Sequence, residues 1–162
     1  MAVNLTIPAQ SDIHAVQGVQ IGIASAGIRK AGNKDLTVFT FVPNTSIAGV
    51  FTTNRFKAAP VQVCEAHLAT ESDVRALVIN TGNANAGTGE PGLADANQTC
   101  NELAKLLHLR PAQILPFSTG VILEPLPMPK LLAALPAAVS DLQDNNWFNA
   151  AHRIMTTDIQ PK

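Results

Sequence analysis

The segment that most constrains this chain is residues 80–89, which contain three glycines, three asparagines, two threonines and no charged residue. The apolar run 76–79 before it predicts a buried strand, and residues 92–107 after it have the periodicity of a helix. Glycine allows positive φ, and asparagine tolerates left-handed geometry and bonds neighbouring backbone. Two interpretations remain open: an ordinary strand-to-helix connector, or a tightly hydrogen-bonded turn beside a ligand.

Alternating, β-branched or aromatic residues predict five strands, at residues 19–24, 36–42, 47–53, 61–63 and 75–79. The continuous apolar run in the last of them predicts burial on both faces. Pro60 stands where the fourth strand would begin, a place where its missing amide donor costs least. Residues 113–116 are expected to be extended.

Helical spacing of apolar residues predicts helices at 92–107 and 147–155, a short helix at 65–70, and a helix at 129–139 that Pro136 breaks or bounds. Asp144 or Asn145 is the expected cap of the last helix. The chain has no repeat, low-complexity segment or linker. We therefore expect a single α/β domain over residues 1–162, with strands early, helices late and mixed layers.

The composition limits what the chain can bind. Of its 162 residues 46% are hydrophobic and only 14% are charged, which is typical of a chain that packs against another. A net charge of −1 provides no basic field for nucleic acid or an anionic membrane. The apolar runs are too short to span a bilayer, and no signal peptide is recognisable, so a cytoplasmic location is expected.

The residues that most often carry chemistry show no complete catalytic set. Cys64 and Cys100 are isolated, and we expect them to be small buried hydrophobes in a reducing compartment. The histidines lack metal-ligand spacing and are expected at the surface or at helix ends: His14, His67, His108 and His152. No nucleophile elbow, Walker loop or dinucleotide fingerprint is present. We expect neither a metal nor a cofactor.

Two further motifs draw attention. Residues 116–122 place Ser118, Thr119 and Gly120 between apolar segments, and residues 155–158 read Met-Thr-Thr-Asp. By themselves these are an ordinary turn and a polar helix end. Residues 80–89, 116–122 and 155–158, in this order, resemble the amino-terminal part of the ornithine acetyltransferase family, and residues 49–61 and 124–127 extend the resemblance. These are bifunctional glutamate N-acetyltransferase/amino-acid acetyltransferases of arginine biosynthesis, and the resemblance covers nearly the whole chain.

The resemblance implies a layered αββα-like sandwich with a mixed sheet, of the self-processing N-terminal-threonine type. It implies transfer of an acetyl group from N-acetylornithine to glutamate through an acetyl-threonine intermediate. The threonine nucleophile would head a second (beta) chain, released by self-cleavage within Ala-Thr, in a heterotetramer of two alpha and two beta chains. Ala69-Thr70 is too early and too polar in context. The cleavage sequence, and the substrate-binding lysine before it, are expected beyond Lys162.

Three residues receive roles from the resemblance. Thr119 and Gly120 match the pair that forms the oxyanion hole, and Thr157 matches a substrate-binding threonine, with Thr156 as the alternative. Residues 80–89 are expected to shape the floor of the site without a catalytic role for any one of them. Three questions stay open: whether acetyl-CoA is also a donor, whether the chain is instead a non-catalytic binding or assembly domain, and whether it belongs to a related self-processing aminopeptidase.

Overall fold

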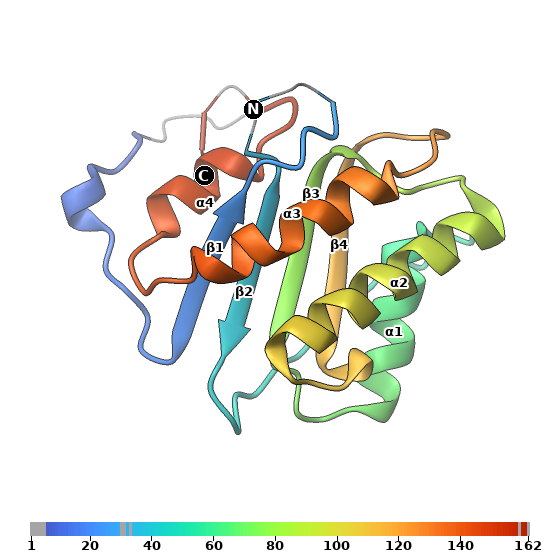
Figure 1. Cartoon of the computed structure of the whole chain (residues 1–162), viewed down its shortest axis with the longest axis horizontal. Helices are drawn as coiled ribbons and strands as arrows, with labels where there is room; N and C mark the ends of the chain where they lie inside the picture. Colours follow the sequence, from blue (N-terminus) through green and yellow to red (C-terminus); the bar gives the residue numbers. More distant parts are fainter. Residues whose placement is uncertain (1–5, 30–31, 33, 159, 162) are drawn as a thin grey trace.

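The structure, a computed structural model, describes residues 6–29, 32, 34–158 and 160–161. Its four strands form one sheet in the order β1 (Val19–Ala24), β2 (Leu36–Phe41), β3 (Ala76–Asn83) and β4 (Ile114–Val121). β1–β2 and β2–β3 are antiparallel, whereas β3–β4 is parallel (Figure 1). The predicted mixed α/β class is therefore confirmed.

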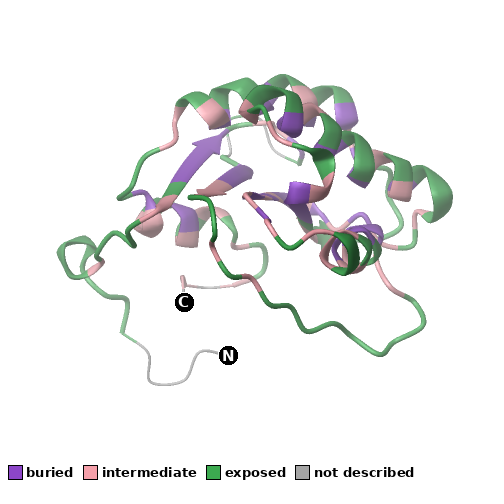
Figure 2. Cartoon of the chain, turned by 90° about the horizontal axis from the view of Figure 1, so that it is seen from below, coloured by how far each residue is buried: buried purple, intermediate pink, exposed green. Residues whose placement is uncertain are grey.

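Four helices flank this sheet: α1 (Ala59–Thr70), α2 (Gly89–Leu107), α3 (Met128–Ser140) and α4 (Trp147–Arg153). Short 3₁₀ turns, η1 (Gln10–Asp12) and η2 (Pro111–Gln113), complete the described secondary structure. Helices α2 and α3 cover one face, while α1 and α4 lie toward the other (Figures 1 and 2). α2 is the crossover helix that a parallel pair such as β3–β4 requires.

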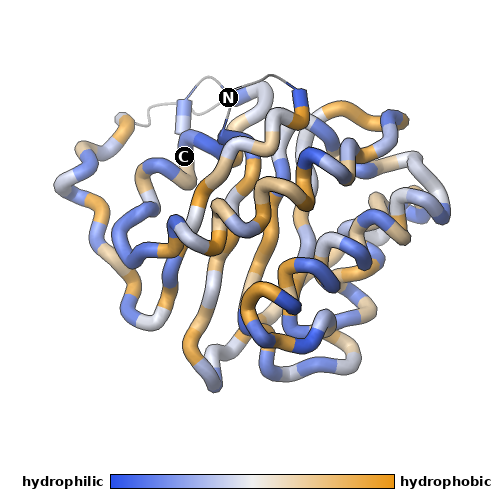
Figure 3. Tube along the Cα trace, viewed as in Figure 1, coloured by the Kyte–Doolittle hydropathy of each residue, from blue (hydrophilic) through white to orange (hydrophobic). Residues whose placement is uncertain are grey.

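The main core lies between the sheet and the pair α2–α3. Val38, Val78 and Ile114 from three neighbouring strands pack with Leu103 of α2 and Leu131 of α3, and each is almost completely buried. Coloured by hydropathy, the trace shows apolar residues along the strands and along both helices that cover this face (Figure 3).

Gly22 sets how closely α3 approaches β1. A Cβ at this position would lie 1.9 Å from the carbonyl oxygen of Ala138 on α3. Only a residue without a side chain permits that contact, so the glycine in the first strand has a packing function.

The opposite face of the sheet is only partly covered. Ile21 and Ile23 of β1 pack against Ala150 of α4, and Leu115 of β4 packs against Cys64 of α1. Two residues beyond Leu115 on the edge strand β4, Phe117 is 42% exposed. The described residues form a single sheet, so the second sheet of the expected sandwich is not in this part of the chain.

Two predicted strands are wrong. Residues 47–53 form no strand, and Val50 is completely exposed, because no neighbouring strand pairs with this apolar segment in the described chain. Residues 61–63 lie inside α1, which begins at Ala59 and includes the predicted short helix 65–70. The proline that fits a strand start fits the first helical turn equally well, and burial of Pro60, Val63 and Cys64 follows helical spacing.

Several boundaries differ from expectation. α2 begins at Gly89, three residues before the predicted start, with Pro91 in its first turn. β3 continues through Asn83, so the glycine-asparagine segment starts as strand. The burial of β3 alternates, so the predicted burial on both faces is wrong.

Two helices also differ in detail from their predictions. α3 continues through Pro136 without a break. Asn146, rather than Asp144 or Asn145, is the N-cap residue of α4. Its side-chain amide donates to the Ile21 carbonyl and the Asp141 carboxylate and makes no capping bond to the helix backbone, while its Oδ1 accepts the side-chain amide of Asn149. Asn146 thus ties α4 to the edge of β1.

Candidate active site

The candidate site lies where the two parallel strands end. In a parallel pair the carboxyl ends meet at one edge, and here Thr81 lies opposite Thr119 and Gly82 opposite Gly120. An open pocket of about 690 Å³ occupies this edge. Its lining combines both strand ends with the segment before β2, the last turn of α4 and the residues after it: Arg29, Lys34, Asp35, Thr81, Gly82, Thr119, Gly120, Val121, His152, Arg153, Met155, Thr156 and Thr157.

Gly120 has a backbone that other residues rarely adopt. Its φ is +138°, and a Cβ there would lie 2.3 Å from the carbonyl carbon of Gly82 and 2.5 Å from the nitrogen of Asn83. The pairing is irregular at this point, since Asn83 faces both Thr119 and Val121. Ser118-Thr119-Gly120 is therefore a distorted strand end and not the turn that its composition indicates.

The hydroxyl of Thr119 is available to a ligand. Thr119 is half-buried in the pocket wall, and its side chain makes no hydrogen bond to any residue that the structure describes. Thr156 and Thr157 reach the same pocket from the segment after α4. The three residues singled out in the sequence, Thr119, Gly120 and Thr157, therefore share one pocket although they come from distant segments.

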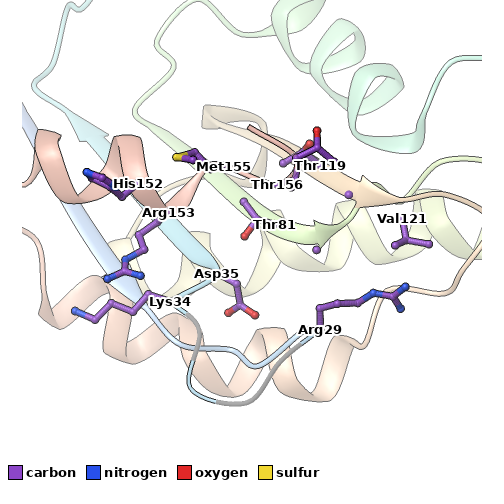
Figure 4. A pocket seen from close by; sticks show the side chains of 13 residues that line it. Arg29, Lys34, Asp35, Thr81, Thr119, Val121, His152, Arg153, Met155 and Thr156 are labelled. Carbon is purple, nitrogen blue, oxygen red and sulfur yellow. The ribbon is translucent and has the colours of Figure 1, made fainter. Parts of the chain in front are cut away.

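The charges around the pocket are mostly positive. Figure 4 shows Lys34, His152 and Arg153 on one side of the pocket and Arg29 on the other, with Asp35 between them. The carboxylate of Asp35 is buried, and it accepts hydrogen bonds from the backbone amides of residues 26, 27 and 28 at 2.7, 3.1 and 2.6 Å. Its charge is thus directed into the protein.

Two of the cations differ in their surroundings. Arg29 forms an exposed ion pair with Glu124 at 2.7 Å, whereas the Nε of Arg153 is buried and has no hydrogen-bond partner in the described chain. A carboxylate on a ligand would complement these cationic side chains around the pocket, which we call the cationic rim (Arg29, Lys34 and Arg153).

Several lining residues were not predicted. Residues 27–35 have only the composition of a turn, and nothing in the sequence places Arg29 or Asp35 beside β4. His152 is at a helix end, as expected, and also lines the pocket. Among these lining residues, the sequence gives a usable indication only for Asp35, because an isolated carboxylate after a glycine-bearing turn often accepts hydrogen bonds from backbone amides.

The cysteines lie outside this pocket and are poor nucleophiles. Both are buried free thiols, as predicted, and burial raises the pKa of each from 9.0 to about 12. The described residues contain no group of three or more histidine, cysteine and acidic side chains that could hold a metal. None of the described helices combines the length and hydropathy needed to cross a membrane.

The fold and the pocket define an α/β protein with a mixed sheet and a pocket, lined by basic side chains, at the carboxyl ends of its two parallel strands. The chain belongs to the ArgJ family, whose profile matches residues 20–162. It is 49% identical, over 172 aligned residues, to the arginine biosynthesis bifunctional protein ArgJ of Colwellia psychrerythraea. The alignment includes all of this chain and 41% of the length of that protein.

Two solved structures share the fold. Ornithine acetyltransferase from Mycobacterium tuberculosis, crystallised with ornithine, is 37% identical with a TM-score of 0.85, over 90% of this chain and 79% of that one. The ArgJ protein from Bacillus halodurans is 31% identical with a TM-score of 0.74, over 91% of this chain and 78% of that one. These matches agree with the mixed α/β architecture described above.

Proposed function

We propose that this chain is part of an acyltransferase of arginine biosynthesis that moves an acetyl group from N-acetylornithine to glutamate. Membership of the ArgJ family and similarity to an ornithine acetyltransferase support the reaction class. The observation that carries the proposal is the convergence of Thr119, Gly120 and Thr157 on one pocket.

In the proposed reaction a threonine hydroxyl of the second chain attacks the acetyl carbonyl of N-acetylornithine. The carbonyl oxygen becomes an oxyanion, which the Thr119 hydroxyl and the Gly120 amide stabilise. Collapse breaks the C–N bond, and the ornithine amine leaves with the proton that the nucleophile's own α-amine took from the hydroxyl. The glutamate amine then attacks the acetyl ester, forms N-acetylglutamate and restores the threonine.

Thr157 and the cationic rim are proposed to bind substrate. Thr157 lines the pocket from the segment after α4 and not from the strand ends, and we propose that its hydroxyl contacts a part of the substrate remote from the acetyl group. Both N-acetylornithine and glutamate carry carboxylates, which suit the side chains of Lys34 and Arg153. No cofactor is required for this chemistry.

The proposed partner is a second chain, produced by self-cleavage and assembled as two alpha and two beta chains. The exposure of Phe117 on the edge strand β4 supports packing against further protein. The chain also spans only 41% of the length of its Colwellia relative. The free thiols of Cys64 and Cys100 suit the reducing cytoplasm that we propose as the compartment.

The test uses the complete protein that contains this chain. N-acetylornithine, acetyl-CoA and a peptide amide are supplied as alternative donors, and the acetylated threonine is sought by mass spectrometry of the quenched enzyme. Acetyl transfer to glutamate from N-acetylornithine supports the proposal, and transfer from acetyl-CoA would add a second donor. Peptide hydrolysis alone would identify the aminopeptidase, and no turnover with any donor would identify a binding domain.

Thr157→Val tests the binding role. Valine keeps the shape and removes the hydroxyl, so KM for N-acetylornithine should rise by up to about tenfold, the equivalent of one neutral hydrogen bond. Thr70→Val is the matched control, because Thr70 is exposed on α1 and its hydroxyl bonds only the carbonyls of residues 66 and 67. An unchanged KM in Thr157→Val would remove this residue from the binding site.

A further inference from the structure

We propose that Asn83, together with Asn80, is a positioning residue that sets the geometry of the Thr119–Gly120 donor pair. The inference rests on the proposed function, since it concerns the same oxyanion site. Neither asparagine lines the pocket, and each is only 3% exposed. Any effect on the reaction must therefore pass through the strand ends that they hold. We call the two side chains and their hydrogen bonds the asparagine clamp.

One arm of the clamp holds the chain after Gly120. The side-chain amide of Asn83 donates from Nδ2 to the carbonyl oxygens of Glu124 and Pro125, each at 3.1 Å. Residues 122–125 follow β4 directly, so this amide fixes the path of the chain as it leaves the site. On the same side chain, Oδ1 accepts the backbone amide of Asn85 at 2.8 Å.

The other arm holds the chain before Thr119. Ser118 donates its hydroxyl to Oδ1 of Asn80 at 2.5 Å. Nδ2 of Asn80 donates to the backbone carbonyl of Asn83 at 2.8 Å, which links the two arms. Thr119 and Gly120 thus lie between two fixed points, Ser118 on one side and residues 124–125 on the other.

Asparagine is suited to this position because a single planar side chain supplies both donors and an acceptor. A carboxylate of the same shape would place oxygen against two carbonyl oxygens and could donate to neither. Asn85 continues the network into α2, donating from Nδ2 to the Gly92 carbonyl at 2.8 Å and accepting the Thr88 hydroxyl at 2.7 Å. Fully satisfied buried polar networks of this kind fix one geometry.

The close contact of Gly120 with β3 makes this geometry sensitive. The backbone of Gly120 is pressed against Gly82 and Asn83, and the amide of Ala84 donates to the Val121 carbonyl at 2.8 Å. A shift of Asn83 therefore moves the Gly120 amide with it. Misplacement of a catalytic group by 1 Å costs roughly 10²-fold in rate, while binding of the ground state is much less affected.

The experiment measures kcat and ornithine affinity for Asn83→Asp in the complete enzyme. The expected result is a loss of about 10²-fold in kcat with ornithine affinity within about twofold of the parent. Asn97→Asp is the matched control. Asn97 is exposed on α2, and its Nδ2 donates to the Leu93 carbonyl at 2.9 Å, so the same chemical change there should leave both values unchanged.

Thr119→Ala separates failure of the inference from failure of the proposed function. If Thr119→Ala keeps the parental kcat, the oxyanion assignment fails, whatever Asn83→Asp does. If Thr119→Ala is impaired and Asn83→Asp is not, only the asparagine clamp is overturned. In the double variant the Asn83→Asp change should cost clearly less than it does alone, because one donor that it positions is already absent.

Two further outcomes would decide the matter. Parallel loss of kcat and ornithine binding in Asn83→Asp would indicate a collapsed pocket and overturn a positioning role. Should Asn83→Asp fail to fold, Ser118→Ala carries the test, because it removes only the hydroxyl link to Asn80. It should lower kcat by about tenfold at unchanged ornithine affinity, and parental kcat in this folded variant would overturn the clamp.

Discussion

The proposed oxyanion donors, the hydroxyl of Thr119 and the amide of Gly120, depend on a single backbone position. With φ at +138° and no room for a Cβ, Gly120 brings β4 against β3 at the edge of the pocket. The hydroxyl of the neighbouring Thr119 has no hydrogen-bond partner in the described chain, and Thr119 lines the same pocket. Donors placed before the reaction begins need no reorganisation when charge develops.

Thr119→Ala should lower turnover in the complete enzyme by about 10²–10³-fold, because one oxyanion donor is lost. Substrate affinity should change little, since the donor acts mainly in the transition state. Thr119→Ser keeps a hydroxyl and should retain much more activity, with some loss because an unbranched side chain is less well fixed. Turnover, ornithine affinity and melting temperature of both variants provide the measurement.

A purely structural role for Thr119 gives a different pattern. Both variants would then melt at lower temperature, and turnover per folded molecule would stay close to that of the parent. The rate of self-cleavage of the precursor provides a second measurement. Attack on the Ala-Thr bond creates a similar oxyanion, so self-cleavage should also slow in these variants if it uses the same donors.

The two cysteines should be unreactive while the chain is folded. Burial raises the pKa of Cys64 and Cys100 from 9.0 to about 12, and for Cys100 the neighbouring Cys64 contributes further. At pH 9.0, where an exposed thiol with the ordinary pKa is half ionised, both should remain protonated. Iodoacetamide should therefore label neither until urea unfolds the complete protein, with labelling followed by mass spectrometry of the peptides.

The same pKa shifts predict weaker folding at alkaline pH. A raised pKa in the folded state means that the stabilisation is fully present below pH 9 and is lost as the pH rises toward about 12. The free energy of unfolding in urea should fall between pH 8 and 10.5, and less so in Cys100→Ala. Equal pH dependence in both proteins would contradict the assignment to this thiol.

At the scale of elements, the sequence predicts those parts of the fold that have one clear periodicity. The alternation in β1 and β2 and the apolar stripe of α2 are visible in the residues themselves, and the structure confirms these elements. Residues 47–53 show equally good local signals and form no strand, because pairing depends on a neighbour that no local pattern reveals. The local pattern of residues 61–63 is likewise compatible with a strand or with the helix α1 that they form, so it does not decide between the two.

The candidate site shows a similar division. Motifs in the sequence predict Thr119, Gly120 and Thr157 as site residues, whereas the other residues that line the pocket are identified only by the structure. Arg29 and Asp35 reach the pocket because antiparallel pairing of β2 with β3 brings the segment before β2 beside Thr81. Such long-range placement follows from topology, which the periodicity of single elements does not determine.

Gly22→Ala should destabilise the contact between β1 and α3. The new Cβ would meet the Ala138 carbonyl at 1.9 Å, so the helix must move away, and we expect a loss of about 1–3 kcal/mol in the free energy of unfolding. Gly49→Ala is the control, because its Cβ would touch only the ends of the Leu68 and Phe51 side chains, at 3.0 and 3.1 Å. Urea unfolding of the complete protein measures both, and equal stabilities would disprove the packing role of Gly22.

At the scale of the whole molecule, the two faces of the sheet are covered to different extents, as expected of a chain that packs against another. α2 and α3 cover one face of the sheet, whereas α1 and α4 lie toward the other face (Figure 2). The pocket opens on this less covered side, next to exposed Phe117. Further protein packed there would cover apolar surface and close the pocket at the same time.

The chain of residues 1–162 alone should therefore transfer no acetyl group from N-acetylornithine to glutamate. Its described pocket offers donors for an oxyanion and cations for carboxylates, but the proposed nucleophile belongs to the second chain. The open sheet face should also make the isolated chain associate with itself or bind a hydrophobic dye. Turnover, light scattering and dye fluorescence are measured for the chain alone and for the complete protein. Transfer by the isolated chain would place a nucleophile within these residues, and a monodisperse monomer without dye binding would show that the face needs no cover.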